Sequence, residues 1–586
     1  MKRRDLLTAA LALAGTSALP GAPAWAAAAG RVRPGAPGWP SEADWAGLGR
    51  ATQGRLSPVT QPNLADPAVK ALLDDPFYIG DQPGLTQSTG WLDAWRAAPS
   101  AYVVAAQSAA DVAAAVRFAR AHNLRLVVRG GGHSYLGAST APDSLLVWTR
   151  RMNAVTVHDA FVAQGSGAAP VPAVSCGAGA VWLNAYQAVT TGAGRYVQGG
   201  GCTTVGVAGL VQGGGFGSLS KGFGTAAASL LEAEVVTADG QVRVVNHARE
   251  PDLFWALKGG GGGTFGVITR LTLATHELPA TFGQAQFTVK ARSDEAYRRL
   301  LARFIDVYAT GLMNPHWGEQ VRAGPNNQLS VQMLFQGLTQ AAAQGAFQPL
   351  ADFVAANPGD YEVKTPLAAS ALPARMFWNG EALRQFVPGA ARFSSRPGAA
   401  KADYWWAGDG EQVGAFWHAY TSAWMPASLL QPQNRAALVD AWFAASRHWP
   451  VAFHFNKGLA GAPAAALAAT RDTATNPEVT EAFALAIIAT SGPSLYGGQE
   501  PNLGAAHIRA GAVQSAMTAL RACAPGAGAY VNECDYFQPD WQRAFWGANY
   551  PRLARIKRRY DPQGLFFVHH GVGSEAWSAD GFGRVG

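Results

Sequence analysis

The stretch Gly199–Gly224, GGGCTTVGVAGLVQGGGFGSLSKGFG, decides how the rest of the chain is interpreted. Glycines recur through it without a fixed period, and Cys202 stands among them. Because glycine has no Cβ, it adopts positive φ and leaves backbone N–H groups open to the phosphate or ring oxygens of a ligand. The stretch therefore predicts a loop whose backbone closely approaches a ligand, with a plain glycine-rich surface loop as the alternative.

A second glycine loop, Arg129–Tyr135 (RGGGHSY), follows the apolar run Leu124–Val128, which is short enough for a buried strand. Before that run, Val103 and Val104 predict an earlier strand, and Ser108 can cap a helix between the two strands. Strand, helix, strand and glycine loop together form a geometry that binds phosphate groups. A position at the end of such a loop favours a ligand-contacting role for His133, with a structural histidine as the alternative.

At these two loops the chain resembles the FAD-linked oxidases of the berberine bridge enzyme type, within the vanillyl-alcohol-oxidase-like flavoproteins. Leu253–Arg270 (LFWALKGGGGGTFGVITR) resembles the family's third flavin-contacting segment, and Tyr530–Phe567 resembles its C-terminal segment. The resemblance implies an α+β fold, with a two-part PCMH-type FAD-binding domain and an α+β substrate domain whose antiparallel sheet covers the flavin.

In that family the histidine of RGGGHSY bonds to the flavin 8α-methyl carbon, and the cysteine matching Cys202 bonds to flavin C6. Carried over to this chain, the resemblance implies bicovalent FAD on His133 and Cys202. It also implies oxygen access beside Val205, because a valine three residues after the cysteine is typical of oxidases. The cofactor-binding residues implied are His133, Cys202, Arg129, Gly130, Gly131, Gly132, Ser134, Tyr135, Gly199, Gly200, Gly201, Thr203, Thr204, Val205, Gly206, Gly209, Gly213, Gly214, Gly215, Gly217, Gly266 and Val267.

Length and composition favour an ordered globular protein of two or three domains. The chain has 586 residues, of which 48% are hydrophobic and 15% charged, and its formal net charge is +7. No basic block follows the first few residues, so nucleic-acid binding has little support. No cysteines form a CxxC pair, and we therefore expect no structural zinc site.

The N-terminal segment reads as a signal peptide over residues 1–26. Lys2, Arg3 and Arg4 precede an apolar run that ends in small residues, and the paired arginines resemble a bacterial twin-arginine (Tat) signal. We therefore expect passage through the Tat export machinery, a periplasmic or secreted protein and no stable membrane association, with a single uncleaved anchor as the alternative. In an oxidising compartment Cys523 and Cys534 either pair or remain free thiols.

Four further segments complete the expected organisation. Residues 27–90 read as an irregular N-terminal segment, 91–277 as the FAD-binding domain, 278–525 as the substrate domain, and 526–586 as a C-terminal segment returning to the FAD domain. Within the substrate domain we expect helices over Asp294–Thr310 and Glu411–Trp424, and strands over Leu329–Phe335, Val451–Phe455 and Phe483–Ala489.

A match to the dinucleotide spacing G-x-G-x-x-A, at Gly222, Gly224 and Ala227, requires a following helix. The residues after it, Leu231–Val236 and Gln241–Val245, instead predict a hairpin around Asp239 and Gly240. We therefore reject NAD binding.

Candidate catalytic residues are Tyr530, Asn532 and His454. The segment YVN resembles the family's Y-x-N, whose tyrosine acts as the base in carbohydrate and alcohol oxidases. The Tyr530 anion would need a neighbouring positive group, and a satisfied core tyrosine is the alternative. His454 lies on the substrate-facing side of an alternating strand, where it either orients substrate or is structural, and Lys457 is expected to face solvent.

Six aromatic residues, Tyr404, Trp405, Trp406, Trp417, Tyr420 and Trp424, suit either a substrate pocket or core packing, and core packing is favoured. The sequence thus predicts an exported FAD-linked oxidase that passes hydride from an alcohol to flavin N5 and reduces dioxygen to hydrogen peroxide. We expect a small-molecule or oligosaccharide substrate, and the favoured class is a carbohydrate or oligosaccharide hemiacetal that is oxidised to a lactone. The alternatives are an oxidase or cyclase of aromatic metabolites, a dehydrogenase with a non-oxygen acceptor, and a flavin-binding protein without turnover.

Overall fold

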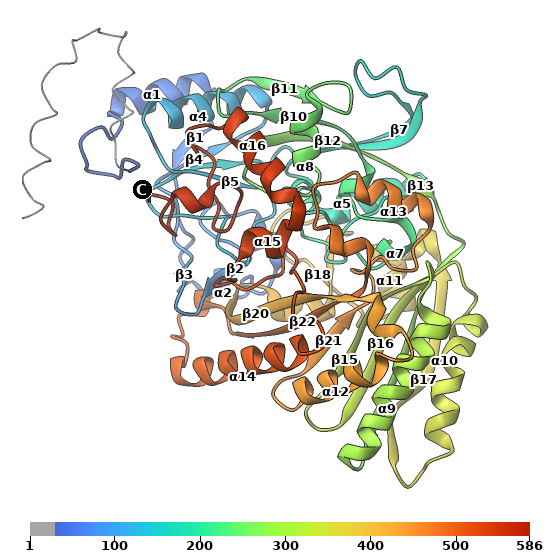
Figure 1. The fold of residues 1–586 in the computed structure, drawn as a ribbon. Coiled ribbons are helices and arrows are strands. Elements are labelled where there is room, and N and C mark those ends of the chain that lie inside the picture. Colours follow the sequence, from blue (N-terminus) through green and yellow to red (C-terminus); the bar gives the residue numbers. More distant parts are fainter. Residues whose placement is uncertain (1–29, 586) are drawn as a thin grey trace, which may run out of the picture.

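The computed structural model describes residues 30–585 and shows two parts, one above the other in Figure 1. The upper part holds a four-stranded and a five-stranded sheet, and the lower part is built on a nine-stranded sheet. The predicted signal peptide lies outside the described residues. Within residues 30–585, no helix is long and apolar enough to cross a bilayer.

The four-stranded sheet has the order β1 (Leu56–Pro58), β4 (Tyr102–Ala105), β6 (Leu145–Trp148) and β5 (Leu126–Arg129). Strands β4 and β5 both run parallel to β6, because helix α4 (Ala109–Ala121) returns the chain between them. Ser108 caps α4: its side chain accepts from Asp111 N–H, and the Asp111 carboxylate accepts from Ser108 N–H. The predicted strand, helix, strand and glycine loop are confirmed.

The five-stranded sheet is antiparallel, with the order β11 (Val242–Val245), β10 (Leu230–Val236), β12 (Val267–Ala274), β8 (Val171–Gly177) and β7 (Val155–Phe161). Val236 pairs with Val242 across the predicted turn, which confirms the hairpin. Only a short 3₁₀ turn, Ala227–Ser229, separates the rejected dinucleotide spacing from β10. The helix that NAD binding requires is therefore not formed there.

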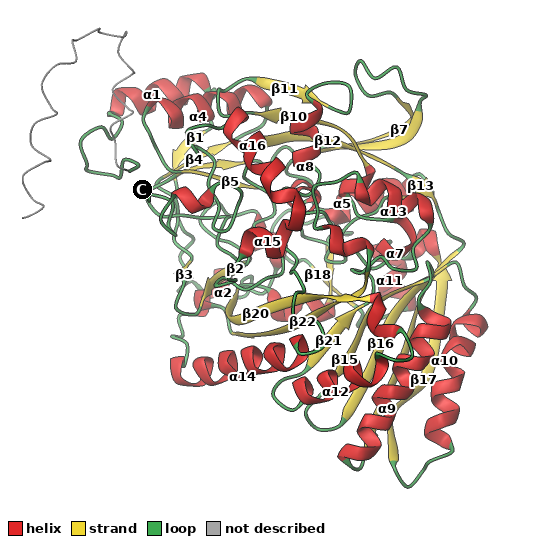
Figure 2. Cartoon of the chain, in the orientation of Figure 1, coloured by secondary structure: helices red, strands yellow, loops and turns green. Residues whose placement is uncertain are grey.

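The nine-stranded sheet of the lower part has its helices on one face, the lower one in Figures 1 and 2. Its order is β17 (Tyr361–Pro373), β14 (Thr281–Ala291), β16 (Gln328–Gln336), β15 (Trp317–Ala323), β21 (Val451–His454), β22 (Ala482–Gly492), β20 (Ala415–Pro426), β2 (Ser88–Trp91) and β3 (Trp95–Arg96). The covering helices are α9 (Asp294–Val307), α10 (Gln340–Ala355), α12 (Arg435–Ser446) and α14 (Leu503–Arg521). The opposite face of the sheet is left to meet the upper part.

Both ends of the described chain form contacts with segments that are distant in the sequence. Strand β2, close to the N-terminal segment, pairs in parallel with β20 and so extends the lower sheet. That segment also contains helix α1 (Glu42–Ala51), which the sequence analysis missed. At the other end, helices α15 (Trp541–Trp546) and α16 (Tyr550–Tyr560) lie in the upper part, and Phe566 forms a bridge to Leu126 of β5.

The helix predicted over Glu411–Trp424 is wrong, because Ala415–Pro426 forms the strand β20. Nearly every residue of β20 is buried, so both of its faces are apolar and its sequence lacks the alternation typical of strands. A register shift between Trp417 and Ala419 places Trp417, Tyr420 and Trp424 in one apolar cluster, which imitates helical spacing.

The six aromatic residues do not form one cluster. Tyr404, Trp405 and Trp406 form the short strand β19 (Tyr404–Trp406) and pack in a different apolar group from those of β20. All four cysteines are free thiols in the structure, and Cys176 is fully buried on β8.

Candidate active site

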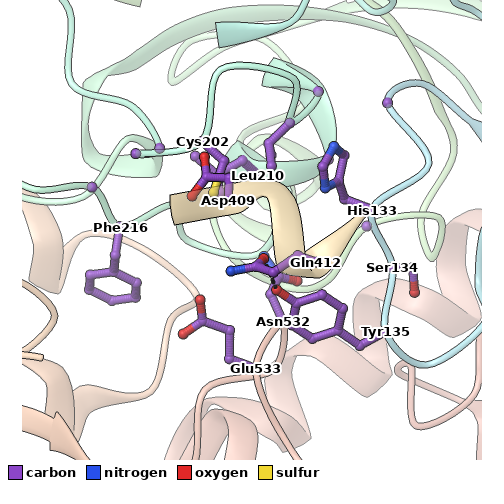
Figure 3. Close-up of a pocket in the computed structure, with 18 of the residues that line it drawn as sticks. His133, Ser134, Tyr135, Cys202, Leu210, Phe216, Asp409, Gln412, Asn532 and Glu533 are labelled. Carbon is purple, nitrogen blue, oxygen red and sulfur yellow. Dashed lines mark hydrogen bonds between the residues drawn. The ribbon is translucent and has the colours of Figure 1, made fainter. Parts of the chain in front are cut away.

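A cavity of about 850 Å³ lies where the two parts meet, within the range of about 300–1,000 Å³ that small-molecule sites occupy. The upper part contributes the glycine loops Gly130–Tyr135 and Gly200–Cys202. The lower part contributes Glu319 of β15 and His454 of β21, and the C-terminal segment contributes Tyr530–Glu533. Figure 3 shows ten of the lining residues by name.

The two glycine loops touch through their backbones. A Cβ added to Gly131 would lie 2.6 Å from Gly206 N, and one added to Gly206 would lie 2.9 Å from Gly131 N. Neither contact is compatible with a side chain. The glycines therefore fix the distance between the loop that carries His133 and the loop that carries Cys202.

His133 is held in the cavity as a neutral imidazole. Its Nε2 lies 3.1 Å from Thr204 Oγ1 in a hydrogen bond, and burial lowers the pKa of His133 to about 4. Within residues 30–585, Nδ1 makes no hydrogen bond. A tautomer that donates from Nε2 to Thr204 would leave the Nδ1 lone pair directed at a ligand.

Cys202 faces a carboxyl group that sequence reasoning missed. Asp409, on the 3₁₀ turn Ala407–Gln412, lines the cavity beside Cys202, and Figure 3 shows the two side chains together. Burial, and then the Asp409 charge, raise the pKa of Cys202 well above its usual value, while burial raises the pKa of Asp409 to about 6.

The Asp409 turn is anchored to the cysteine loop. Trp406 Nε1 donates to Gly201 O at 3.1 Å, and Thr203 Oγ1 donates to Tyr404 O at 2.8 Å. These bonds fasten the loop to the end of β19, which precedes the turn. On the far side of the turn, the Tyr135 hydroxyl donates to Gln412 Oε1 at 3.2 Å.

Two more charged contacts lie in the cavity. Lys457 forms an ion pair with Glu533, and the Ser218 hydroxyl donates to Glu319. The expectation that Lys457 faces solvent is wrong, since only 11% of its side chain is exposed. Strand β21 ends at His454, so the strand alternation used for that expectation no longer applies at Lys457.

Tyr530 and Asn532 form a pair, with Asn532 Nδ2 donating to Tyr530 Oη at 2.9 Å. Burial, and then the Glu533 charge, raise the pKa of Tyr530. The Tyr530 anion would need a positive neighbour, but the charge that acts on Tyr530 is the Glu533 carboxylate. Glu533 directly follows the YVN motif in the sequence. Its position next to the motif could have identified it as a site residue.

His454 lines the cavity, as the alternation of its strand predicts. Burial, and then the Lys457 charge, lower its pKa well below the usual value, so this imidazole is neutral.

Arg129 plays a structural part at the edge of the cavity. Its guanidinium donates to Leu85 O at 2.7 Å and to Pro83 O at 2.5 Å, which ties the N-terminal segment to β5. These two bonds engage Nη1 and Nη2 with backbone carbonyls.

Most of the implied cofactor residues line the cavity, but seven do not. Gly199 lies against the Trp182 ring, Gly213 leaves room for the Asn532 amide, and Thr204 reaches the site only through its bond to His133. Neighbouring side chains fill the space beside Gly199 and Gly213. The seven are Gly199, Thr203, Thr204, Gly213, Gly214, Gly215 and Val267.

No group of three or more His, Cys, Asp or Glu side chains is arranged to hold a metal ion in the described part of the chain. The chemistry that the cavity offers comes from its thiol, neutral imidazoles, carboxylates and tyrosines.

Comparisons with known proteins identify the class. A family model of the FAD binding domain matches residues 99–246, and one described as berberine and berberine like matches residues 529–573. An uncharacterized FAD-linked oxidoreductase of Arthroderma benhamiae is 31% identical over 100% of both chains. A VAO-type flavoprotein oxidase of Thermothelomyces thermophilus is 30% identical over 83% of this chain and 78% of its own.

Solved structures of VAO-type flavoproteins and related oxidases have a similar fold. A VAO-type flavoprotein from Myceliophthora thermophila has a TM-score of 0.77 and 27% identity, covering 95% of this chain and 100% of its own. Glucooligosaccharide oxidase from Acremonium strictum, described with a 6-S-cysteinyl, 8α-N1-histidyl FAD, has a TM-score of 0.65 and 18% identity over 90% of this chain and 98% of its own.

The chain is an FAD-linked oxidoreductase with the VAO/PCMH-type fold. It belongs to the berberine-bridge-like family of these flavoproteins. The site fits the cofactor, because two glycine loops in backbone contact present a neutral imidazole and a thiol to one cavity.

Proposed function

We propose that the protein is an oxidase with bicovalently bound FAD that oxidises an alcohol, with a carbohydrate or oligosaccharide hemiacetal as the favoured substrate and a lactone as product. The observation that carries this proposal is that His133 and Cys202 line the same cavity, on loops fixed by the Gly131–Gly206 contact. Oxygen reduction to hydrogen peroxide is part of the proposal, with Val205 lining the cavity.

For the cofactor, His133 would supply Nδ1 to the 8α carbon and Cys202 would supply Sγ to C6. The hydrogen bond between His133 Nε2 and Thr204 supports this assignment, because it leaves Nδ1 for the second bond. The double linkage described for glucooligosaccharide oxidase, a distant structural relative, is of the same kind.

The bound flavin would accept a hydride from the substrate carbon while a protein group takes the hydroxyl proton. Glu533 is the better placed proton acceptor of the two candidates, because it is a carboxylate held in an ion pair with Lys457, whereas burial disfavours the Tyr530 anion. Tyr530 Oη accepts from Asn532, so its own hydrogen is free to be donated to a substrate oxygen. Tyr530 as the base remains the alternative.

The wall of the cavity supports a ring-shaped substrate. Trp406, Tyr135 and Tyr420 contribute aromatic surface, which suits sugar rings and aromatic rings alike. A second candidate substrate, a basic aromatic metabolite, is favoured because the three carboxyl groups of Glu319, Asp409 and Glu533 outnumber the two lining cations, Lys457 and Arg129.

We also propose export of the protein, on the basis of its first 26 residues alone. The relatives named above are fungal, and they give no support to a bacterial origin or to the twin-arginine route. Sequencing the N-terminus of the mature protein tests the proposal, and a mature chain that begins at Met1 would contradict it.

The test of function begins with the intact mass of the acid-denatured protein. We expect a mass increased by one FAD, with peptides containing His133 and Cys202 joined through it. A panel of oligosaccharides, simple alcohols and basic aromatic alcohols is then assayed twice, for anaerobic bleaching of the flavin and for peroxide. Bleaching without peroxide would indicate a dehydrogenase, and no bleaching by any alcohol would contradict the oxidase proposal.

A further inference from the structure

The Asp409 carboxyl has an unusual place in the cavity. It comes from a turn that the chain reaches about 200 residues after Cys202, yet the hydrogen bonds from Trp406 and Thr203 hold that turn against the cysteine loop. One of its oxygens, Oδ2, is buried and has no hydrogen-bond partner among the described residues. No arginine or lysine forms a salt bridge with it in that part of the chain.

A purely structural role does not account for this buried and unpaired Asp409 carboxyl group. A buried carboxylate is costly unless it is paired, and the other carboxyl groups of the cavity do have partners: Lys457 for Glu533 and Ser218 for Glu319. Asp409 instead faces the Cys202 thiol, a weak donor that is a poor partner for a buried charge.

Cys202 on its own is poorly prepared to react. A thiolate is the nucleophile in cysteine chemistry, and burial raises the pKa of Cys202, so the thiol is protonated at neutral pH. A bond from Sγ to a flavin carbon therefore requires a group that takes the thiol proton at the moment of attack.

We propose that Asp409 is the general base that takes the Cys202 proton when Cys202 becomes bonded to the flavin. This inference rests on the proposed bicovalent linkage and adds the residue that makes the cysteine bond. The raised pKa of Asp409, about 6, supports the assignment, because a stronger base accepts a proton more readily while still being ionised at pH 7.

The proposed step replaces the S–H bond of Cys202 and the C–H bond at flavin C6 with one S–C bond. The Cys202 S–H bond breaks, the proton goes to the Asp409 carboxylate, and the sulfur electron pair forms the bond to flavin C6. The hydrogen on C6 leaves as a proton, and the two electrons left on the ring pass to dioxygen with two protons. The sum is one thiol, one FAD and one dioxygen giving one thioether-linked FAD and one hydrogen peroxide.

The alternative bases in the cavity are less suited. Glu533 is paired with Lys457 and Glu319 accepts from Ser218, whereas Asp409 is the carboxyl group that lies beside the thiol in Figure 3. His133 is neutral, but its Nε2 is bonded to Thr204. Lys457, the cation acting on Cys202, would lower the thiol pKa without removing its proton.

The experiment compares the wild-type holoenzyme with D409N, and with E533Q as the matched control. D409N keeps the size and one hydrogen-bond acceptor but loses the basic carboxylate, whereas E533Q removes a carboxylate that acts on Cys202 through charge alone. Each protein is denatured, free thiols are alkylated, and the peptides that carry Cys202 and His133 are quantified by mass spectrometry. This readout is the state of the sulfur, not turnover.

We expect wild type and E533Q to carry flavin on both residues, and D409N to carry it on His133 alone with an alkylated Cys202. In D409N the rate of the cysteine bond should fall by about 10²-fold. Incubating aerated D409N at pH 9.5 should form the bond faster than at pH 7, because the small ionised fraction of the thiol rises with pH. In D409E, which keeps a carboxylate, we expect the bond to form.

Two outcomes would overturn the inference while leaving the proposed function intact. One is a D409N protein with the same cysteine linkage as wild type. The other is a D409N protein without any flavin, which would show that Asp409 supports the whole site and not the sulfur step. A wild type whose Cys202 carries no flavin would instead overturn both this inference and the bicovalent linkage.

Discussion

Glu533 and Tyr530 lie three residues apart in the sequence and line the same cavity, but their neighbours differ in charge. Lys457 pairs with the Glu533 carboxylate, while Tyr530 is buried beside that negative charge. A base must be deprotonated before it can accept a proton, so the ionised carboxylate is the better placed of the two. Tyr530 is then left to position the substrate through its hydroxyl.

This reasoning predicts different effects for two conservative substitutions. E533Q should slow flavin reduction by the substrate about 10²-fold or more, while Y530F should slow it about 10-fold. Rapid mixing under anaerobic conditions measures both rates by the loss of flavin absorbance. The opposite order, with Y530F the slower variant, would return the role of base to Tyr530.

At the scale of elements, the glycine-rich stretch owes its composition to two different demands. Gly131 and Gly206 bring two loops into backbone contact, whereas Gly217 folds the stretch back so that its Cα lies against Gly199 O. A side chain at Gly217 would collide with that carbonyl, which cannot move without displacing the loop.

We therefore expect G217A to destabilise the protein by about 3 kcal/mol, at the upper end of what overpacking costs. The matched control is G201A, in the same stretch, where the nearest atom would be 3.7 Å from the added Cβ. Thermal unfolding of both variants checks this prediction. Equal midpoints for the two variants would show that the loop adapts to the extra carbon.

The C-terminal helix α16 is fastened by a buried ion pair. Lys557 Nζ lies 2.7 Å from the Asp561 carboxylate and also donates to Thr264 O at 2.6 Å and Phe566 O at 2.7 Å. The Lys557 side chain is 7% exposed and that of Asp561 is fully buried. The pair thus joins the C-terminal segment to the upper part.

Removing one partner leaves an unpaired buried charge, so D561A should cost about 3–5 kcal/mol. E295A serves as the control, because Glu295 pairs with Arg299 on the surface of α9, with 86% of its side chain exposed. We expect that change to cost less than about 0.5 kcal/mol. Denaturant titration measures both, and a D561A protein as stable as E295A would contradict the assigned role.

At the scale of the whole molecule, the two faces of the lower sheet have different neighbours. The lower sheet buries one face under α9, α10, α12 and α14, and turns the other toward the upper part and its glycine loops. The cavity therefore lies between a rigid sheet and two fixed loops. Two histidines of the upper part are partly buried, and this burial lowers the pKa of His276 to about 4 and that of His570 to about 3.

Such histidines stay neutral in the folded protein, while the unfolded chain takes up their protons below about pH 6.5. Their contribution to stability is therefore present above about pH 6.5 and is lost progressively as the pH falls towards the folded-state values. Between pH 7 and pH 5, wild type should lose about 1–2 kcal/mol more than H276N. Thermal midpoints at a series of pH values check this, and parallel pH profiles for the two proteins would contradict it.

Much of the upper part could be predicted from the sequence, because the patterns that identify its elements are local. The capping box at Ser108, the glycine loop ending in His133 and the hairpin around Gly240 each depend on residues close together in the chain. The lower part was less accessible. In β20, burial on both faces removed the alternation that identifies a strand, and a register shift imitated a helix.

By itself the sequence determined the family resemblance, the two loops that carry His133 and Cys202, and the elements fixed by caps, turns and short-range periodicity. Only the tertiary structure decided which charged groups share the cavity, since Asp409, Glu319, Lys457 and Glu533 come from separate elements. It also decided which of them are paired and which thiol meets a carboxyl group. The physical reason is that burial and pairing set protonation, and both depend on contacts between residues hundreds of positions apart.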